Sequence, residues 1–557
     1  MNNLARTILD TLDRGGPALT YAFLVPGQAG TRVLAPELAK LARAAAAGYR
    51  AAGIAPRTVV PLLIGSSPEL WAAFVGAMAA DLIPCIFSTP TFKTHLPTYL
   101  RNLTTLLTRY ESRTLVADAQ TREKLAPVLA ELAPGVELAE VDQLLAATGP
   151  APEPATGGGD VAFLQHSSGS TGTPKGVALA HDAVLGHLDA YAAAIALDPA
   201  RDRIASWLPL YHDMGLVTSF LLPLVKGVTC ATLPPGAWIM DPTTILAVMT
   251  AERSTLAWWP NFTHALLASR VRDEQLADYD LSSLRMVVNC SEPVLARSHA
   301  EFQKRFADCG VGVGVLQASY AMAENVFAVT QSSGRGPMVF HAKPGSLQPG
   351  SRLEPSHEGD VLARSLMSSG KPIDGVRIRI VDEKHQGQPE GQVGEIAIAG
   401  SSLFREYLAL PDVTAAARDG DWYFTSDVGF VYHGELFVLG RKTDLIIVGG
   451  RKFYPNEIER VAASVDGVKE GRVVAFGLDS AERGTQEVVV LVESAHHEDR
   501  ARVQAIKKEI KGRVQREIDV TVDHTRVLAP QTLIKTSSGK IARKDNRAWF
   551  AERLSEN

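Results

Sequence analysis

Apolar residues near the start of the chain recur first at helical and then at strand-like spacing. The segment that opens at Pro36 predicts a helix with one apolar face, made of Leu38, Leu41, Ala45 and Tyr49. The alternation continues with a strand over 59–64, a helix over 68–80 and a strand over 82–87. Helices that alternate with buried strands are typical of βα units and mostly parallel sheets. The pattern therefore predicts an α/β fold.

The same alternation extends to about Leu439, and the character of the chain changes from Gly440 onward. A Pro- and Gly-rich surface connection over 151–160 leads into a further strand candidate at 161–164. We expect a large N-terminal α/β domain with several subdomains and mostly parallel sheets, residues 1–440. A small, mobile α+β domain, residues 441–557, is expected to follow it.

The helix expected near 503–518 in the small domain combines an apolar stripe with a basic remainder. Its apolar positions are Val503, Ile506, Ile510, Val514 and Ile518, and its basic ones are Lys507, Lys508, Lys511, Arg513 and Arg516. A solvated helix face is one interpretation of these charges, and a docking surface for an acidic partner is the other. The pattern leaves both open.

Composition and charge narrow the class of protein. The chain has 557 residues, of which 46% are hydrophobic and 21% charged, as in a globular protein with sizeable cores. A net charge of -5 argues against a general nucleic-acid binder, which would be basic. The most apolar stretch, 215–228, is interrupted by Pro223 and Lys226 and is too short to span a membrane. Without a signal-peptide pattern at the start, we expect a cytoplasmic location.

Four cysteines occur without a paired spacing: Cys85, Cys230, Cys290 and Cys309. We interpret them as core thiols in a reducing compartment, not as a disulfide framework or a zinc site.

The strongest chemical signal is a Ser/Gly-rich run that directly follows the strand candidate at 161–164. Its candidate phosphate-binding residues are Ser167, Ser168, Gly169, Ser170, Thr171, Gly172 and Lys175. Glycines let backbone N–H groups approach phosphate oxygens, hydroxyls add donors, and lysine adds charge. The run is not a Walker loop, because Gly176 and not Ser or Thr follows Lys175. A flexible linker is the alternative interpretation.

Together with later motifs in the same order, this run resembles the adenylate-forming superfamily, which includes acyl-CoA synthetases and fatty acyl-AMP ligases. The resemblance covers nearly the whole chain and implies ATP and Mg²⁺ as cofactors. The segment 208–215, Leu-Pro-Leu-Tyr-His-Asp-Met-Gly, is especially similar to that of the fatty acyl-AMP ligases. Amino-acid-activating relatives have an Asp near His212, so an α-amino acid is disfavoured, unless the alignment shifts to Asp213. By resemblance, His212 is a candidate catalytic residue, and a structural role in the core is the alternative.

Two segments resemble those that surround the adenine in this superfamily. The first contributes Ser291, Glu292 and Pro293, and the second contributes Ser319, Tyr320, Ala321, Met322 and Glu324. The resemblance implies that Tyr320 stacks on adenine and that Glu324 holds Mg²⁺, which prefers one or two carboxylates with phosphate oxygens. Ala321 and Ala323 replace a Gly and a Thr of the motif, so one hydrogen bond to the α-phosphate is in doubt.

The remaining motifs lie towards the C-terminus. By resemblance, Asp427 accepts hydrogen bonds from the ribose hydroxyls, although Ser426 stands where relatives have Gly. Arg441 contacts ribose or phosphate, and Thr443 takes the hinge position. Lys540, in a Ser-Gly-Lys context, takes the role of the catalytic lysine.

The implied activity is a ligation in two steps. A carboxylic acid, expected to be a fatty acid, reacts with ATP to give acyl-AMP and pyrophosphate. The acyl group then passes to the phosphopantetheine thiol of an acyl carrier protein, in polyketide or lipopeptide biosynthesis. Transfer to coenzyme A, as in an acyl- or aryl-CoA synthetase, is the alternative. The long polar stretch 330–366 fits the insertion that acyl-AMP ligases carry.

A protein of another class, one that binds a nucleotide without catalysing a reaction, is also compatible with the sequence. Ala321 and Ala323 would suit a degenerate nucleotide-binding scaffold that has lost turnover. Lys540, Glu324, Asp427 and Arg441 argue against it, because the charged groups of the reaction are all retained.

Overall fold

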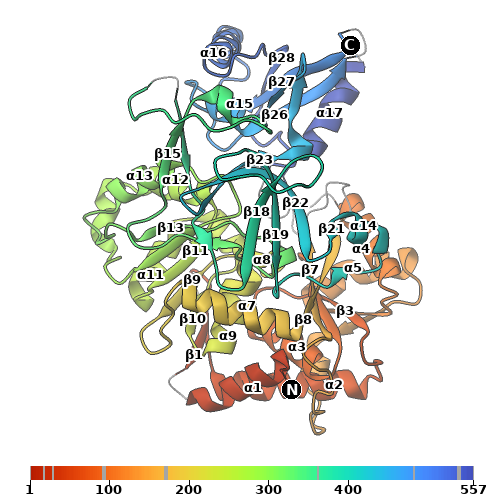
Figure 1. Ribbon diagram of the computed structural model, residues 1–557. Helices are drawn as coiled ribbons and strands as arrows, with labels where there is room; N and C mark the ends of the chain where they lie inside the picture. The colour runs from red at the N-terminus through yellow and green to blue at the C-terminus, as the bar shows by residue number, and fades with distance from the viewer. Residues whose placement is uncertain are drawn as a thin grey trace. The chain divides into compact units, whose positions relative to one another are not determined.

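The computed structural model describes residues 2–16, 19–27, 30–90, 96–167, 174–360, 363–480, 483–535 and 541–555 (Figure 1). The chain forms two compact units. The first comprises Met1–Pro337, Gly370–Arg377 and Ala399–Tyr423, and the second comprises Met338–Ser369, Ile378–Ile398 and Phe424–Asn557. The boundary expected at residue 440 concerns movement of the C-terminal segment, and it stays a prediction.

The first unit contains a seven-stranded sheet in the order β13-β12-β11-β9-β10-β1-β2. Its strands are β1 (Thr20–Phe23), β2 (Thr31–Leu34), β9 (Arg203–Ser206), β10 (Thr229–Thr232), β11 (Leu256–Trp259), β12 (Met286–Asn289) and β13 (Leu316–Ala318). Neighbouring strands from β13 to β1 are parallel, and only β2 runs antiparallel to its neighbour. Because these strands are parallel, the loops that follow their carboxyl ends lie along one edge of the sheet.

A second seven-stranded sheet of the same unit has the order β20-β8-β7-β4-β3-β5-β6. Its strands are β3 (Val59–Leu63), β4 (Ile83–Ile86), β5 (Thr114–Ala117), β6 (Glu137–Glu140), β7 (Val161–Ser167), β8 (Lys175–Ala180) and β20 (Glu406–Tyr407). The strands predicted at 59–64, 82–87 and 161–164 are confirmed. β7 runs on to Ser167 because it pairs antiparallel with β8 up to Lys175.

Helices connect the strands, as the sequence predicted. Those of the first unit are α1 (Leu4–Gly15), α2 (Ala35–Ala51), α3 (Pro68–Ala79), α4 (Leu96–Arg109), α5 (Ala119–Leu132), α6 (Val141–Leu145), α7 (His181–Ala194), α8 (Asp213–Leu216), α9 (Leu222–Lys226), α10 (Pro235–Met240), α11 (Thr244–Glu252), α12 (Asn261–Arg270), α13 (Ala296–Arg305) and α14 (Pro411–Ala416). A π-helical turn, Val217–Leu221, joins α8 to α9. α3 is buried almost throughout, which explains why its sequence is apolar all round.

Several short ladders complete the middle of the chain. The stretch 330–366 begins with β14 (Thr330–Gln331), which pairs with β17 (Lys371–Pro372). It also contains β15 (Val339–Ala342), which pairs antiparallel with β16 (Arg364–Met367). A five-stranded sheet consists of β18 (Val376–Val381), β19 (Gly394–Gly400), β22 (Trp422–Tyr432), β21 (Arg418–Asp419) and β23 (Glu435–Arg441). The interpretation of 330–366 as an insertion stays a prediction.

The C-terminal part of the second unit is a small α+β assembly. Its elements are β24 (Ile446–Val448), β25 (Arg451–Phe453), α15 (Pro455–Ala463), β26 (Val473–Ser480), β27 (Thr485–Glu493), α16 (Arg500–Ile518), β28 (His524–Leu528) and α17 (Arg543–Ser555). The sheet β26-β27-β28 packs one face on α15 and α16 and the other on α17. Of the predicted stripe on α16, Ile506, Ile510, Val514 and Ile518 are buried. The predicted fold class is confirmed.

Two findings bear on the environment of the chain. Among the described helices, none combines the length and the apolar character that a bilayer crossing requires. All four cysteines are buried and carry free thiols, as the interpretation as core residues predicted.

Candidate active site

In the first unit, the predicted motifs follow the carboxyl ends of parallel strands. Tyr211 comes after β9, Ser291 after β12, and Ser319 after β13. Gln165 on β7 donates to the Tyr211 carbonyl at 2.9 Å, which joins the second sheet to the 208–215 segment. Ser319 N–H donates to the Asn289 carbonyl at 3.1 Å. Ligands of α/β proteins bind outside the carboxyl ends of such strands, so these loops form a candidate site.

The first adenine segment is held by contacts on both sides of Ser291. Ser291 has φ +71°, in the left-handed region that residues other than glycine rarely adopt. The Sγ of Cys290 approaches the Sδ of Met214 at 2.9 Å, and Glu292 Oε2 accepts from Phe262 N–H at 3.2 Å. The structure therefore brings Cys290 and Ser291 against Met214, in the segment that contains His212, while Glu292 lies against the start of α12.

A buried polar network lies at the start of the first adenine segment, residues 290–294. Asn289 Nδ2 is 3.0 Å from both Asn261 Oδ1 and His299 Nε2. Burial lowers the pKa of His299 to about 4, so the imidazole is neutral at physiological pH and its Nε2 accepts the amide proton. Asn261 also accepts from Leu295 N–H at 3.1 Å. The network fixes both ends of the segment 290–294.

The second adenine segment forms a tight hairpin around Glu324. Tyr320 accepts at its carbonyl from Val329 N–H at 2.7 Å, and Ala321 bridges to Ala328. At the tip, a short 3₁₀ turn, Ala323–Asn325, presents Glu324, which is 8% exposed. Glu324 Oε1 accepts a hydrogen bond from the Tyr407 hydroxyl at 2.7 Å. The hairpin thus holds Ser319 to Glu324 in one fixed arrangement.

The phosphate-loop residues Ser168, Gly169, Ser170, Thr171 and Gly172 lie outside the described residues. The flanks of the loop are described: Ser167 pairs with Lys175 across the β7–β8 ladder. Lys175 Nζ lies 3.9 Å from the centre of the Tyr407 ring, and Arg109 donates to the Pro174 carbonyl at 3.2 Å. Two cationic side chains therefore accompany the end of the loop.

His166, just before the loop, is neutral. Burial, assisted by the nearby Arg109 charge, lowers its pKa to about 4, and its Nε2 is 3.2 Å from the Tyr110 hydroxyl. It belongs to the support of the loop and does not add charge to it.

His212 has a local role in addition to any catalytic one. It occupies the N-cap position of α8, and its Nδ1 is 2.5 Å from Asp213 Oδ1 and 3.3 Å from Met214 N. One ring nitrogen cannot both donate and accept. Asp213 Oδ1 already accepts from Met214 N–H at 2.7 Å, so we assign the Nδ1 proton to the bond with Asp213. The catalytic role of His212 stays a prediction.

In the second unit, Asp427 and Arg441 face each other across β22 and β23. They are register partners, with Arg441 Nε 3.3 Å from Asp427 Oδ1, and Asp427 is 9% exposed. Ser426 has φ +61°, which explains why the resembled motif has Gly there. Its N–H donates to Glu395 Oε1 at 3.0 Å, and Glu395 also pairs with Lys442 at 3.1 Å. The ladder and these bonds hold the carboxylate that is predicted to bind ribose.

Lys540 lies outside the described residues, as does the rest of 536–540. The two ends of that segment are fixed by neighbouring residues: Lys535 forms a β-bridge with Ile541. The Asn546 side chain accepts from Ile534 N–H at 3.0 Å and donates to the Ile534 carbonyl at 2.9 Å. Arg543 donates to Asp444, to Glu459 at 2.8 Å and to the Ala475 carbonyl at 3.0 Å.

Sequence reasoning did not identify four residues that support the site: Tyr407, Arg109, Arg543 and Asn546. Tyr407 is remote in sequence from both Lys175 and Glu324, and no motif spacing indicates their contact. Arg543 and Asn546 lie within or just after the Ser-Gly-Lys motif, so their position near Lys540 was a signal that could have been used.

Glu324 fits the part of a single protein ligand for Mg²⁺. Its Oε1 is occupied by Tyr407, and among the described residues no donor contacts Oε2. The described residues also contain no cluster of three His, Cys, Asp or Glu side chains that would form an all-protein metal site. A cation that keeps phosphate oxygens and water in its shell needs only one or two carboxylates, which this arrangement provides.

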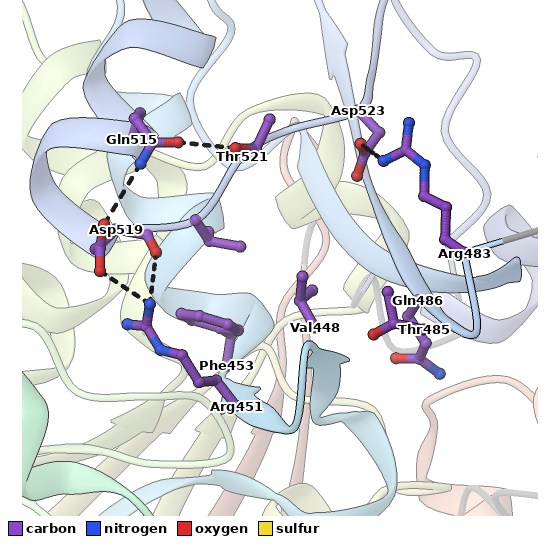
Figure 2. Close-up of a pocket in the computed structure, with 11 residues that line it drawn as sticks. Val448, Arg451, Phe453, Arg483, Thr485, Gln486, Gln515, Asp519, Thr521 and Asp523 are labelled. Atoms are coloured by element: carbon purple, nitrogen blue, oxygen red, sulfur yellow. Dashed lines mark hydrogen bonds and ion pairs between the residues drawn. The ribbon is translucent and has the colours of Figure 1, made fainter.

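A recess of about 330 Å³ in the second unit contains none of the predicted site residues (Figure 2). Arg451 pairs with Asp519 at 2.8 Å and Arg483 with Asp523 at 2.6 Å, while Gln515 and Thr521 bond each other at 2.9 Å (Figure 2). Because its charges are paired internally, the recess gives no sign of an anionic ligand.

Known proteins resemble the chain along most of its length. A long-chain-fatty-acid–AMP ligase of Mycobacterium marinum is 31% identical over 530 residues, which cover 88% of this chain and 86% of the relative. A medium-chain-fatty-acid–[acyl-carrier-protein] ligase of Teredinibacter turnerae is 30% identical over 419 residues, covering 72% and 64%. A structure from work on the fatty acyl-adenylate ligases of E. coli and L. pneumophila has a TM-score of 0.89 and 25% identity, covering 99% and 98%.

The family of AMP-binding enzymes matches residues 16–408, a span that includes the phosphate loop, both adenine segments and Tyr407. The resemblance found in the motifs is thereby confirmed: the chain belongs to the AMP-binding enzyme family.

Proposed function

We propose that this protein is a fatty acyl-AMP ligase that loads an acyl carrier protein. It activates a carboxylic acid with ATP and transfers the acyl group to a phosphopantetheine thiol. The observation that carries the proposal is the meeting of separate motifs of the first unit at the carboxyl ends of parallel strands, with the buried Glu324 linked to Lys175 through Tyr407. The names of the relatives from M. marinum and T. turnerae support the same activity.

The first step joins two anions. A carboxylate oxygen attacks the α-phosphorus of ATP, the bond to the β-phosphate oxygen breaks, and pyrophosphate leaves. Positive charge and N–H donors around the phosphates lower the barrier by offsetting the charge that repels the carboxylate. In our proposal, Ser167 to Gly172 and Lys175 surround the phosphates, and Lys540 approaches the carboxylate and α-phosphate. Mg²⁺, held by Glu324, supplies charge neutralisation when bound.

In this proposal, several motifs of the chain contribute to binding the nucleoside. Ser291, Glu292 and Pro293 flank the adenine with their backbone, and Tyr320 stacks on it. Asp427 accepts from the ribose hydroxyls, and Arg441 contacts ribose or phosphate. Support for the ribose role comes from the burial of Asp427 and from its fixed place in the β22–β23 ladder.

The second step transfers the acyl group. The thiol loses its proton, its sulfur attacks the carbonyl carbon of the mixed anhydride, and AMP leaves with the bridging oxygen. We propose that residues 441–557 turn about the segment near Thr443 between the two steps, so that Lys540 leaves the site. A hinge requires only a few residues that absorb the change in φ and ψ, and Thr443 is an exposed residue in a short turn, Lys442–Asp444.

The acceptor is tested by presenting the two thiols side by side. Purified enzyme is supplied with ATP, a fatty acid and either coenzyme A or a holo carrier protein, and thioester formation is followed by mass spectrometry. We expect transfer to the carrier protein to be at least about tenfold faster, a difference of about 1.4 kcal/mol in barrier. Faster acyl-CoA formation would instead establish the alternative, an acyl-CoA synthetase.

A further inference from the structure

Tyr407 connects two parts of the proposed site that are far apart in sequence. It lies on β20, paired with Val177 of β8, and its side chain is almost fully buried. Its hydroxyl donates to Glu324 Oε1 at 2.7 Å. Its ring carries the Lys175 ammonium at 3.9 Å from the ring centre.

The hydrogen-bond directions around Tyr407 are determined by counting protons. A phenol is protonated at neutral pH and has one proton to donate. Glu324 can only accept when ionised, so Tyr407 gives its proton to that carboxylate. The Tyr423 hydroxyl, 3.1 Å away, must then donate to the Tyr407 oxygen. Tyr423, Tyr407 and Glu324 therefore form a directed chain that ends on one carboxylate oxygen.

The same chain leaves the second oxygen of Glu324 available. Fixing one oxygen of a metal-binding carboxylate with an outer donor orients the other towards the cation, and the loss of such donors typically lowers metal affinity 10- to 100-fold. A cation over an aromatic ring is held by the negative face of the ring, and phenylalanine provides that face as well as tyrosine. The hydroxyl and the ring of Tyr407 thus have separable effects.

We propose that Tyr407 is a positioning residue for the metal–nucleotide complex, in which its hydroxyl orients Glu324 and its ring holds Lys175 at the end of the phosphate loop. This inference rests on the proposed function, because it assumes that Glu324 and Lys175 bind metal and phosphate. Tyr407 itself need not touch ATP. A purely structural tyrosine would affect stability and leave metal affinity unchanged, which gives the inference its test.

The test measures metal binding directly. Mn²⁺ replaces Mg²⁺, and the free Mn²⁺ signal in electron paramagnetic resonance is titrated with full-length protein in the presence of a non-cleavable ATP analogue. Tyr407→Phe should weaken binding of the metal–nucleotide complex about 10- to 100-fold. Tyr21→Phe is the matched control, because it also removes a buried hydroxyl of the first unit, one that is 3.4 Å from the Pro223 carbonyl.

Two further variants separate the two effects. Tyr407→Leu removes the ring as well and should weaken nucleotide binding beyond Tyr407→Phe, because the aromatic face that holds the Lys175 ammonium is lost. In a Glu324→Gln background, Tyr407→Phe should change metal affinity less than about twofold, since it acts through the carboxylate that has been altered. Thermal unfolding of each variant is measured as the control for a retained fold.

The outcomes distinguish this inference from the proposed function. A Tyr407→Phe protein that binds the Mn²⁺–nucleotide complex as tightly as Tyr21→Phe would overturn the inference, even with normal ligase activity. A tenfold or greater loss that persists unchanged in the Glu324→Gln background would overturn it too. Failure of the unmodified enzyme to exchange pyrophosphate with any acid would instead count against the proposed function.

Discussion

Arg543 and Asp444 form an ion pair inside the second unit. Arg543 follows Lys540 by three residues, and Asp444 directly follows Thr443. Arg543 also bonds Glu459 at 2.8 Å and the Ala475 carbonyl at 3.0 Å. The segment that follows the proposed catalytic lysine is thus tied to the residue beside the proposed hinge.

The first prediction concerns that ion pair. Arg543→Gln leaves Asp444 and Glu459 without their cation, so we expect a loss of about 1–3 kcal/mol in unfolding free energy. Adenylation, measured by pyrophosphate exchange, should fall about tenfold because Lys540 is less well positioned. The matched control is Arg547→Gln on the same helix, whose exposed pair with Asp479 should contribute less than about 1 kcal/mol. Equal effects of the two variants would contradict the positional role of Arg543.

A second prediction separates the two reaction steps. Lys540→Ala should lower the rate of acyl-AMP formation at least about 100-fold, because one donor to the developing charge is lost. Transfer of the acyl group from added acyl-AMP to the thiol should remain within about threefold of normal. Single-turnover kinetics of each step provide the measurement. Loss of both steps to the same degree would show that the lysine is misassigned.

The third prediction tests the ribose contact. Asp427→Ala should raise the KM for ATP about 10- to 100-fold, in line with the loss of hydrogen bonds to a charged group. ATP and 2′-deoxy-ATP should then be used almost equally, because the variant no longer recognises the hydroxyl. Asp421→Ala is the control, since Asp421 is an exposed carboxylate 3.8 Å from Arg377. If the Asp427→Ala enzyme still prefers ATP to 2′-deoxy-ATP as strongly as the unmodified enzyme does, Asp427 does not bind the ribose hydroxyl.

The fourth prediction concerns pH. Burial lowers the pKa of His187 from 6.5 to about 3. The unfolded chain takes up this proton as the pH falls below 6.5, whereas the folded chain does not until about pH 3. The stability that the neutral imidazole contributes is therefore complete above pH 6.5 and is lost as the pH falls. The expected slope is about 1.4 kcal/mol per pH unit for this one proton.

His187→Gln should remove that slope. The glutamine oxygen can still accept from Ala328 N–H, as His187 Nε2 does at 3.2 Å, but it does not titrate. Denaturant unfolding of both proteins between pH 7.5 and 5 should give curves of stability against pH that converge in acid. Both proteins should remain pH-sensitive through His166, His181 and His299, whose pKa values burial lowers to about 4, so the difference between the two curves isolates His187. Parallel curves would contradict a neutral, buried His187.

The sequence indicated most of the fold because local patterns and the tertiary structure agree. Pro36 lies in the first turn of a helix, as predicted. The ends of strands were less predictable where pairing between distant residues determines them. For example, β7 continues to Ser167 because β8 supplies hydrogen-bonding partners. The strand pairs within 330–366 depend on partners that no local spacing indicates.

The candidate site divides in the same way. Motif residues such as Ser291 and Glu324 were identified because their segments resemble those of a known family and occur in the same order. Tyr407 was missed, because its role comes from contacts with Lys175 and Glu324 that only the folded chain creates. His212 received a chemical interpretation from its motif, and the structure adds its position at the start of α8 and its contact with Asp213.

The most direct test of the account follows oxygen atoms. A fatty acid labelled with ¹⁸O at both carboxylate positions is incubated with enzyme, ATP, Mg²⁺ and holo carrier protein, and the AMP produced is weighed by mass spectrometry. Attack of the carboxylate on the α-phosphorus requires that one ¹⁸O leave with AMP while the other stays in the thioester. AMP that carries one ¹⁸O per thioester formed is the predicted result. Thioester formation accompanied by unlabelled AMP, or by ADP, would contradict an acyl-AMP intermediate.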